Sequence, residues 1–217
     1  MKKNIRDLVK EWPKCFIQES DLAMLLNDKT DDARHSLIKR TLKNKVLIRL
    51  RRGLYLIADK MKPMVDEFEL SMLIYGPSFV SLESALSYHG WIPETVYATT
   101  CVTTKRAKKL KTSIGIFSYE HVPLKEFYVG IDRIETVQSV FFIATPWRAL
   151  ADFMYVTRRS WKTLFELELD LRIDVEDAMN SDKEMLRLLI EKYPSRRVCD
   201  NLKKFLKEIK KTLKANV

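Results

Sequence analysis

The residues of this chain best placed to do chemistry are cations, and they alternate with apolar residues in the segment 47–57. Side chains alternate between the two faces of a strand, so Arg49 and Arg51 are expected on one face and their apolar neighbours on the other. Gly53 follows Arg52 and permits a tight reversal or a bulge. The segment therefore predicts a small hairpin with an arginine-rich tip, a surface suited to binding phosphate.

A second basic segment, residues 31–43, precedes the hairpin and is predicted to be a helix. Asp31 and Asp32 open it, which suits an N-cap and the positive end of the helix dipole. An apolar stripe is expected at Ala33 and Leu37, to which Ile38 and Leu42 are possible additions. The cations fall mostly off that stripe, so this helix is expected to expose them.

Two further helices are expected before the basic helix. An opening helix is expected from Ile5 to Trp12, ended by Pro13, and a shorter one from Ser20 to about Asn27. Two helices, a basic helix and a basic hairpin follow one another in a winged helix-turn-helix, which binds DNA. Residues 1–62 are therefore predicted to be a DNA-binding domain, with candidate DNA contacts at Arg34, His35, Lys39, Arg40, Lys43, Arg49, Arg51 and Arg52.

The net charge of +10 over 217 residues is unevenly distributed. Residues 1–62 hold 16 Lys and Arg against 8 Asp and Glu, residues 63–195 hold 15 against 19, and residues 196–217 hold 8 against 2. Two basic ends thus flank a mildly acidic middle. Regional basicity is what phosphate binding by counterion release requires, although a single surface lysine more often serves only solvation.

Residues 63–217 are predicted to form a mixed α/β domain with a helical C-terminus, which makes the whole chain α+β. A helix is expected from about Val65 to Tyr75, ended by Gly76-Pro77, and a Ser81-capped helix ends at Gly90. Thr145 and Pro146 open another helix. Strands are expected at 79–80, 95–104, 114–121, 127–129 and 137–143, a basic loop at 105–111, and closing helices at 161–171, 182–192 and 195–213.

Two further groups of cations form a possible secondary basic surface. One group lies in the predicted loop 105–111. The other lies on the polar face of the last helix, whose apolar face must pack on the body of the protein. Each group is either an ordinary solvated face or a second contact for nucleic acid or an acidic partner. The residues concerned are Lys105, Arg106, Lys108, Lys109, Lys203, Lys207 and Lys210.

Nothing in the sequence has the spacing of a catalytic or metal site, so no enzyme activity, cofactor or metal is expected. The three histidines lie far apart with no cysteine or acidic cluster between them. The helix dipole accounts for Glu83, and Asp152 is expected to pair with Arg148 four residues earlier. Three scattered cysteines, no signal segment and no long apolar run favour a reduced, cytoplasmic setting without a membrane span.

Three segments together resemble a known family. They are Arg52-Gly53-Leu54-Tyr55, the segment from Phe79 to Gly90 with Ser-Leu-Glu-Ser-Ala-Leu at its centre, and Thr145-Pro-Trp-Arg-Ala-Leu-Ala-Asp152. In this order and spacing, over roughly residues 1–160, the chain resembles the type IV abortive-infection antitoxins of the AbiEi kind. The resemblance implies a winged-helix autorepressor that binds inverted repeats at its own promoter. It also implies an antitoxin that neutralises a nucleotidyltransferase-like toxin in phage defence.

Two other functions remain open from the residues alone. One is a nuclease component of a defence system with a winged-helix targeting domain, although no metal-binding carboxylate cluster is evident. The other is an RNA-binding adaptor that uses both basic ends, although few aromatic residues accompany the N-terminal cations. A double-stranded DNA partner is therefore the leading expectation.

Overall fold

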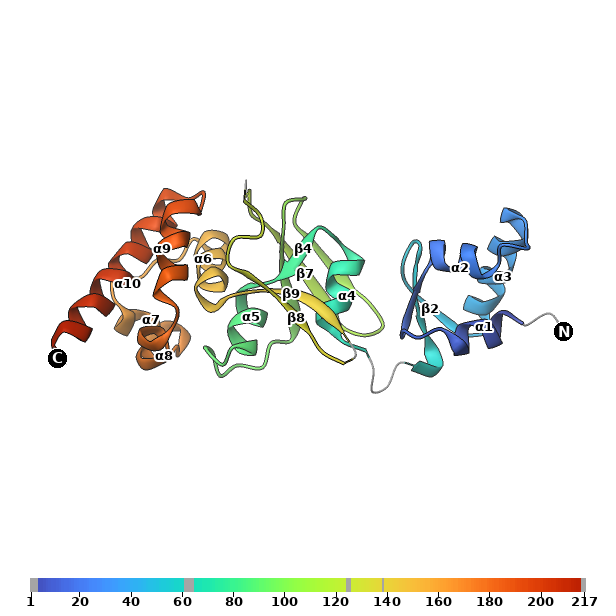
Figure 1. The fold of residues 1–217 in the computed structure, drawn as a ribbon, viewed down its shortest axis with the longest axis horizontal. Helices are drawn as coiled ribbons and strands as arrows, with labels where there is room; N and C mark the ends of the chain where they lie inside the picture. Colours follow the sequence, from blue (N-terminus) through green and yellow to red (C-terminus); the bar gives the residue numbers. More distant parts are fainter. Residues whose placement is uncertain (1–3, 61–64, 124–125, 138, 216–217) are drawn as a thin grey trace. The chain divides into compact units, whose positions relative to one another are not determined.

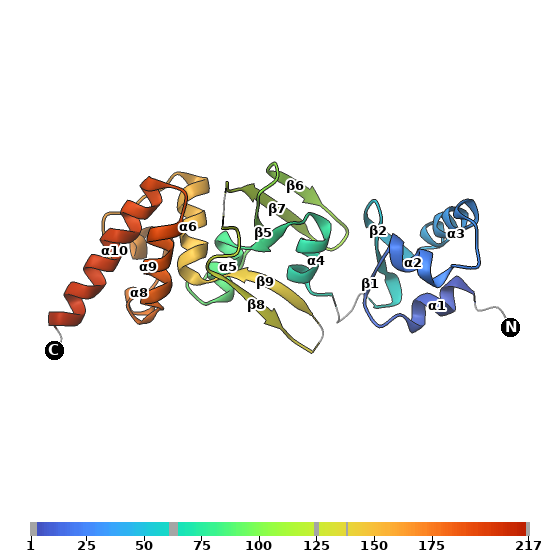
Figure 2. The same ribbon diagram turned by 45° about the horizontal axis from the view of Figure 1, so that its top comes forward.

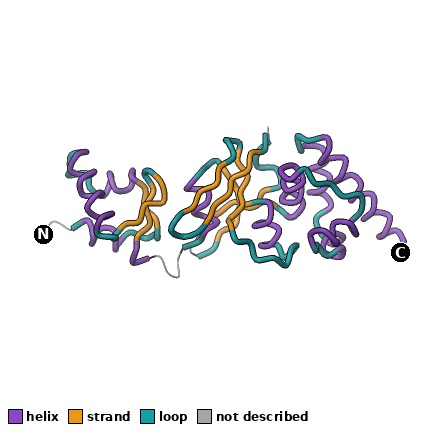
Figure 3. The backbone as a smooth tube through the Cα atoms, turned by 180° about the vertical axis from the view of Figure 1, so that it is seen from behind, coloured by secondary structure: helices purple, strands orange, loops and turns teal. Residues whose placement is uncertain are grey.

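The computed structural model describes residues 4–60, 65–123, 126–137 and 139–215, and the chain divides into two compact units, Met1–Ile74 and Tyr75–Val217 (Figure 1). Figure 3 shows that both units combine helices with strands. The predicted boundary between residues 62 and 63 falls in the segment 61–64, outside the described residues. The mixed α/β character and the helical C-terminus of the prediction are confirmed.

The first unit contains a three-stranded antiparallel sheet and its surrounding helices. Its elements are α1 (Ile5–Glu11), β1 (Phe16–Gln18), α2 (Glu19–Leu25), α3 (Asp31–Lys43), β2 (Leu47–Arg51), β3 (Leu54–Ile57), the 3-10 turn η1 (Ala58–Lys60) and α4 (Glu67–Ile74). The strand order is β1-β3-β2. Helices α1 to α3 and the hairpin occur within two residues of their predicted positions. Strand β1 was not predicted, because three residues are too short to show alternation.

Apolar side chains from all three helices and the sheet form the core of the first unit. On α3 the buried residues are Ile38 and Thr41, whereas Ala33 and Leu37 are only half buried. The half-buried Leu37 and Leu42 pack against the same core as Ile38, so the predicted stripe is confirmed at these three positions. Burial of Thr41 is possible because its hydroxyl donates to the carbonyls of Leu37 and Ile38, at 3.1 and 2.8 Å. The core comprises Ile5, Val9, Ile17, Leu22, Leu26, Ile38, Leu47, Tyr55 and Ile57.

The basic hairpin contains a β-bulge that the sequence did not reveal. Arg49 lies opposite Tyr55, but the next pair joins Arg51 to Leu54, so one residue of β2 has no partner. Tyr55 and Leu54 are neighbours on β3 and point to opposite faces. The prediction that Arg49 and Arg51 share one face is therefore wrong, because the extra residue reverses the alternation.

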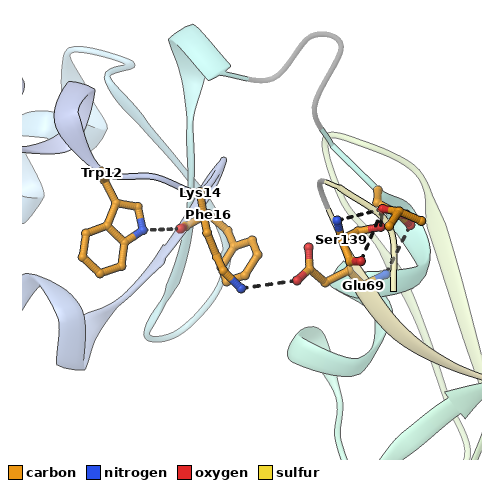
Figure 4. A network of polar contacts seen from close by, with 7 residues as sticks. Trp12, Lys14, Phe16, Glu69 and Ser139 are labelled. Carbon is orange, nitrogen blue, oxygen red and sulfur yellow. Dashed lines mark hydrogen bonds and ion pairs between the residues drawn. The ribbon is translucent and has the colours of Figure 1, made fainter. Parts of the chain in front are cut away.

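Polar contacts fix the segment between α1 and β1. The indole Nε1 of Trp12 donates to the carbonyl of Phe16 at 2.9 Å, and Lys14 Nζ lies 3.5 Å from Glu69 Oε1 on α4 (Figure 4). Helix α4 was predicted over 65–75 with its apolar residues mostly buried. It buries Leu70 and Ile74 together with the polar Glu69 and Ser71, while Phe68, Met72 and Leu73 are half buried.

The second unit contains a six-stranded mixed sheet of order β6-β7-β5-β4-β9-β8 (Figure 2). The β4–β9 and β5–β7 pairs are parallel, and the β4–β5, β6–β7 and β8–β9 pairs are antiparallel. The strands are β4 (Ser78–Val80), β5 (Ala98–Thr103), β6 (Lys108–Lys111), β7 (Ile116–His121), β8 (Ile131–Glu135) and β9 (Val140–Ala144).

Two predictions for this sheet are wrong. The segment 105–111, expected to be a loop, contains the edge strand β6, where lysines discourage pairing with another chain. The segment 127–129, expected to be a strand, is a turn, and the chain is extended from Ile131 instead. The aromatic and β-branched residues of 127–129 favour a strand intrinsically, but tertiary contacts override that preference.

Helices cover the sheet and continue to the C-terminus. Helix α5 (Leu82–Tyr88) packs on β5 and on α6 (Pro146–Thr157), and α6 contacts β9, α9 (Lys183–Lys192) and α10 (Arg196–Ala215). Helices α7 (Leu164–Leu171) and α8 (Val175–Asn180) contact one another. Helix α8 was not predicted, whereas α7, α9 and α10 match the expected closing helices.

The last helix is amphipathic, as its sequence predicted. Val198, Leu202, Phe205 and Ile209 are fully buried, while its lysines are exposed. Within the described residues, no helix is long and apolar enough to cross a membrane.

Candidate functional site

The second half of α3 exposes three cations on one face. Lys39, Arg40 and Lys43 lie opposite the buried Ile38 and Thr41, as a rotation of about 100° per residue requires. Across residues 4–60 and the rest of the described chain, the side chains of these three cations form no ion pair or hydrogen bond. Their charge is therefore available to an outside anion.

The first turn of α3 is different, because its basic side chains already have partners. Arg34, whose side chain is 24% exposed, pairs with Asp31 and also donates to the carbonyl of Lys29 at 3.3 Å. Nε2 of His35 lies 3.3 Å from Oε1 of Glu19. The structure thus separates Arg34 and His35 from the open cations that the sequence had grouped with them.

The arginines of the hairpin are also unequal. Arg51 donates from Nε to the carbonyl of Leu73 and from Nη1 to the carbonyl of Arg52, both at 2.9 Å. The Arg49 guanidinium lies 6.0 Å from the centre of the Tyr55 ring. Among the described residues, the exposed Arg52 side chain has no polar partner. Arg52 is consequently the most available cation of the hairpin.

The tip of the hairpin is anchored to α2. Gly53 has a φ of +76°, and its carbonyl accepts a hydrogen bond from the amide of Glu19 at 3.0 Å. A Cβ at position 53 would lie 3.3 Å from Oε2 of the same glutamate. Because Glu19 also meets His35, this one residue links the hairpin tip to α3.

Sequence reasoning missed one cation at this surface. Lys45 is exposed in the turn between α3 and β2, where its φ is +55°. Its signal was the spacing of Lys43 and Lys45 around Asn44, which continues the basic run beyond the helix. Lys45 joins Lys39, Arg40, Lys43 and Arg52 as cations that lack a carboxylate partner within the described chain.

The possible secondary basic surface lies on two separate elements of the second unit. Lys105 donates to the carbonyl of Gly76, and the ammonium groups of Lys105 and Lys108 lie 5.5 and 5.3 Å from the centre of the Tyr75 ring. Arg106 and Lys109 are exposed. Lys203, Lys207 and Lys210 line a groove between α9 and α10, and Lys203 lies 3.3 Å from Asp200. Figure 2 shows α6 between α10 and the sheet.

Asp152 lies at the centre of a buried polar network in the second unit. One of its oxygens accepts from Ser81 Oγ at 2.8 Å, and the other accepts from the Tyr193 hydroxyl at 2.9 Å. Nε of Arg148 donates to both oxygens, at 3.0 and 3.1 Å. Burial and the neighbouring Asp152 carboxylate raise the pKa of Tyr193 well above its usual value, which keeps this hydroxyl a donor.

The network joins two of the segments that carry the family resemblance, because Ser81 belongs to one of them and Asp152 to the other. The predicted Arg148–Asp152 pair is confirmed, but Ser81 does not cap α5 with its side chain, since its hydroxyl is bound to Asp152. Asp152 is fully buried, and both of its oxygens are hydrogen-bonded. This arrangement stabilises the fold and offers no access to a substrate.

The remaining candidate side chains have local partners or no special surroundings. Nε2 of His89 lies 2.9 Å from the carbonyl of Ala144, and Nδ1 of His121 lies 2.9 Å from that of Lys105. Glu83 is half buried in the first turn of α5. Cys15, Cys101 and Cys199 are free and buried. In the part of the chain that the structure describes, no three His, Cys, Asp or Glu side chains are grouped to hold a metal ion.

Comparison of the chain with protein-family models and with curated proteins found no match.

Proposed function

We propose that this chain is a cytoplasmic DNA-binding autorepressor and antitoxin, in which a winged helix formed by residues 1–62 contacts the promoter. The second unit, in this proposal, neutralises a nucleotidyltransferase-like toxin. The surface of α3 is the main support for the DNA-binding part. A helix that exposes Lys39, Arg40 and Lys43 on one face, without carboxylate partners in the described chain, suits insertion beside a phosphate backbone.

The hairpin supports the same interpretation. Its order after α3, its anchored tip and the exposed Arg52 are features expected of a wing that meets the backbone or the minor groove. Asp31 and Asp32 occupy the opposite end of α3 from Lys43. A phosphate backbone would therefore meet the C-terminal half of α3 and the turn that contains Lys45.

The antitoxin part of the proposal rests on the resemblance of the segments Phe79–Gly90 and Thr145–Asp152 to the family. A buried hydrogen bond from Ser81 to Asp152 joins the two segments within the second unit. The proposed division of labour assigns DNA binding to the first unit and toxin neutralisation to the second.

A separation-of-function experiment tests this proposal. The variant Lys39→Ala/Arg40→Ala/Lys43→Ala should lose repression of a reporter placed behind the DNA upstream of the chain's own gene. The same variant should still rescue growth when a nucleotidyltransferase encoded beside that gene is co-expressed. The exposed positions of the three residues make an effect on folding small, within about 0.5 kcal/mol each.

The matched control is Lys203→Ala/Lys207→Ala/Lys210→Ala, which removes the same charge from α10. This control should retain repression. If both triple variants reduce repression equally, total charge rather than the α3 surface is responsible, and the assignment to α3 fails. Stronger binding to single-stranded RNA than to double-stranded DNA would favour the RNA-binding alternative instead.

A further inference from the structure

A cleft of about 470 Å³ opens in the second unit where two of the family-like segments meet. His89 and Trp91 follow α5, while Thr145, Pro146 and Trp147 begin α6. The two indole rings contact edge to face, with centroids 4.9 Å apart. The remaining walls come from β8 and from the α8–α9 turn, and are formed by Asp132, Asp177, Asn180, Ser181, Asp182 and Met185.

The charge of this cleft is opposite to that of the chain. Three aspartates line it and no lysine or arginine does, although the chain as a whole carries a net charge of +10. The Asp182 carboxylate already has partners, because it accepts hydrogen bonds from the backbone amides of Glu184 and Met185 at the start of α9. The exposed carboxylates of Asp132 and Asp177 have no polar partner among the described residues.

Two of the residues that line the cleft carry a polar atom without a partner. The Nε1 of Trp147 and the Oγ1 of Thr145 are buried and make no hydrogen bond within the described chain. Trp147 itself is 1% exposed. A buried polar atom without a partner is unfavourable and rare in folded proteins. Since both residues line the cleft, a bound molecule is a natural source of the missing partners.

We propose that this cleft binds an organic cation, an ammonium or guanidinium group carried on an apolar chain. Asp132 and Asp177 supply the negative charge, the hydroxyl of Thr145 can accept a hydrogen bond from the cation, and the indoles and Met185 contact the alkyl part. A metal ion is a poorer match, because the described residues contain no group of three His, Cys, Asp or Glu suited to one. The proposal does not depend on DNA binding.

Two sources share this chemistry, namely a free amine and a basic side chain of another protein. Trp147 Nε1 can only donate, so it needs an acceptor. A peptide-borne arginine or lysine offers a backbone carbonyl as well as a cation, whereas a free diamine offers only cations. The two sources are distinguishable by comparing agmatine with the peptide acetyl-Gly-Arg-Gly-amide.

The test is a titration of the ¹⁵N-labelled full-length chain with each probe, followed through the indole N–H resonance of Trp147. Binding should shift this resonance in a saturable way. Asp132→Asn and Asp177→Asn should each weaken binding by about tenfold, the effect of removing a charged hydrogen-bond partner. Glu176→Gln is the matched control, since it neutralises a neighbouring exposed carboxylate on α8 that does not line the cleft. Its affinity should stay within about twofold of that of the parent chain.

Tighter binding of the peptide would identify a protein side chain as the source, and tighter binding of agmatine a free amine. Either result supports the proposal when the two aspartate variants lose affinity. The proposal is overturned if neither probe shifts the Trp147 resonance. It is also overturned if the aspartate variants bind as well as Glu176→Gln, or if propionate, an anion of similar size, shifts the resonance equally.

Discussion

Arg40 and Arg52 of the first unit and Arg148 of the second have opposite roles. In the first unit, Arg40 and Arg52 are exposed, and their guanidinium groups have no partner in the described chain. In the second unit, Arg148 is 1% exposed, donates to both oxygens of Asp152 and lies 4.9 Å from the centre of the Phe79 ring. An arginine side chain is thus free to bind an external group in the first case, and is hydrogen-bonded within the core in the second.

The difference teaches that surroundings, rather than residue type, decide what a charge does. A buried charge is tolerated only when it is paired, and removing its partner is strongly destabilising. An exposed charge contributes little to stability and remains free to attract an external anion. Mutations at the two kinds of site should therefore separate cleanly, into changes of stability and changes of binding.

The largest effect is expected from Asp152→Ala, which leaves Arg148 buried without its carboxylate. The free energy of unfolding should fall by about 3–5 kcal/mol. Chemical denaturation followed by tryptophan fluorescence measures it, because three of the four tryptophans (Trp91, Trp147 and Trp161) lie in the second unit.

Asp200→Ala is the matched control for Asp152→Ala. Asp200 pairs with Lys203 at 3.3 Å, but both side chains are more than half exposed. Its loss should cost about 1 kcal/mol or less. Equal losses at positions 152 and 200 would contradict the assignment of a stabilising role to the buried pair.

A smaller loss, of about 1–2 kcal/mol at neutral pH, is expected for Tyr193→Phe, which deletes one hydrogen bond to the Asp152 carboxylate. Folding raises the pKa of Tyr193. The contribution of this hydroxyl to the free energy of unfolding is therefore fully present below the unfolded pKa of about 10, and it is lost as the pH rises above that value. The parent chain should therefore lose stability above about pH 10.

Above pH 10, the free energy of unfolding should fall less steeply with pH in Tyr193→Phe than in the parent, by up to about 1.4 kcal/mol per pH unit. Burial also raises the pKa of Tyr119, so part of the decline should remain in the variant. Denaturation curves collected across the alkaline range check this expectation. A decline as steep in Tyr193→Phe as in the parent would show that folding does not raise the pKa of Tyr193.

The smallest effect compares two neighbouring arginines of the hairpin. Arg52→Ala should reduce the slope of log K against log salt for double-stranded DNA by about 0.9, the value for one phosphate contact. Arg51→Ala should change the slope less, because its guanidinium already donates to the carbonyls of Leu73 and Arg52. A larger change for Arg51→Ala would mean that the hairpin rearranges on binding.

Much of the fold was predictable from local patterns. The helical period placed α1, α3, α6, α9 and α10, and the Arg148–Asp152 pair followed from their spacing on one helix. These features depend on neighbours within a few residues of one another. The short strand β1 and the β-bulge at Arg49–Arg51 depend on partners in distant strands, which a single sequence does not reveal.

The sequence named candidate residues for the site, but it did not show which of them already have partners within the fold. The sequence grouped seven lysines and arginines with His35, and the structure separates them by their partners, since Arg34 is paired with Asp31 and His35 lies beside Glu19. Lys45 joins the surface only because the turn after α3 exposes it. The acidic cleft was not predicted, because Trp91, Asp132, Thr145 and Asp177 come from four separate segments.

Salt-dependent binding of double-stranded DNA by the full-length chain tests the central claim most directly. The parent and the variant Lys39→Ala/Arg40→Ala/Lys43→Ala would be compared on DNA from upstream of the chain's own gene. The salt slope should decrease by about 2.7, and affinity near 0.1 M salt should fall by roughly two orders of magnitude, with unfolding free energy unchanged. An unchanged slope and affinity in this variant would contradict the assignment of α3 as the DNA-binding surface.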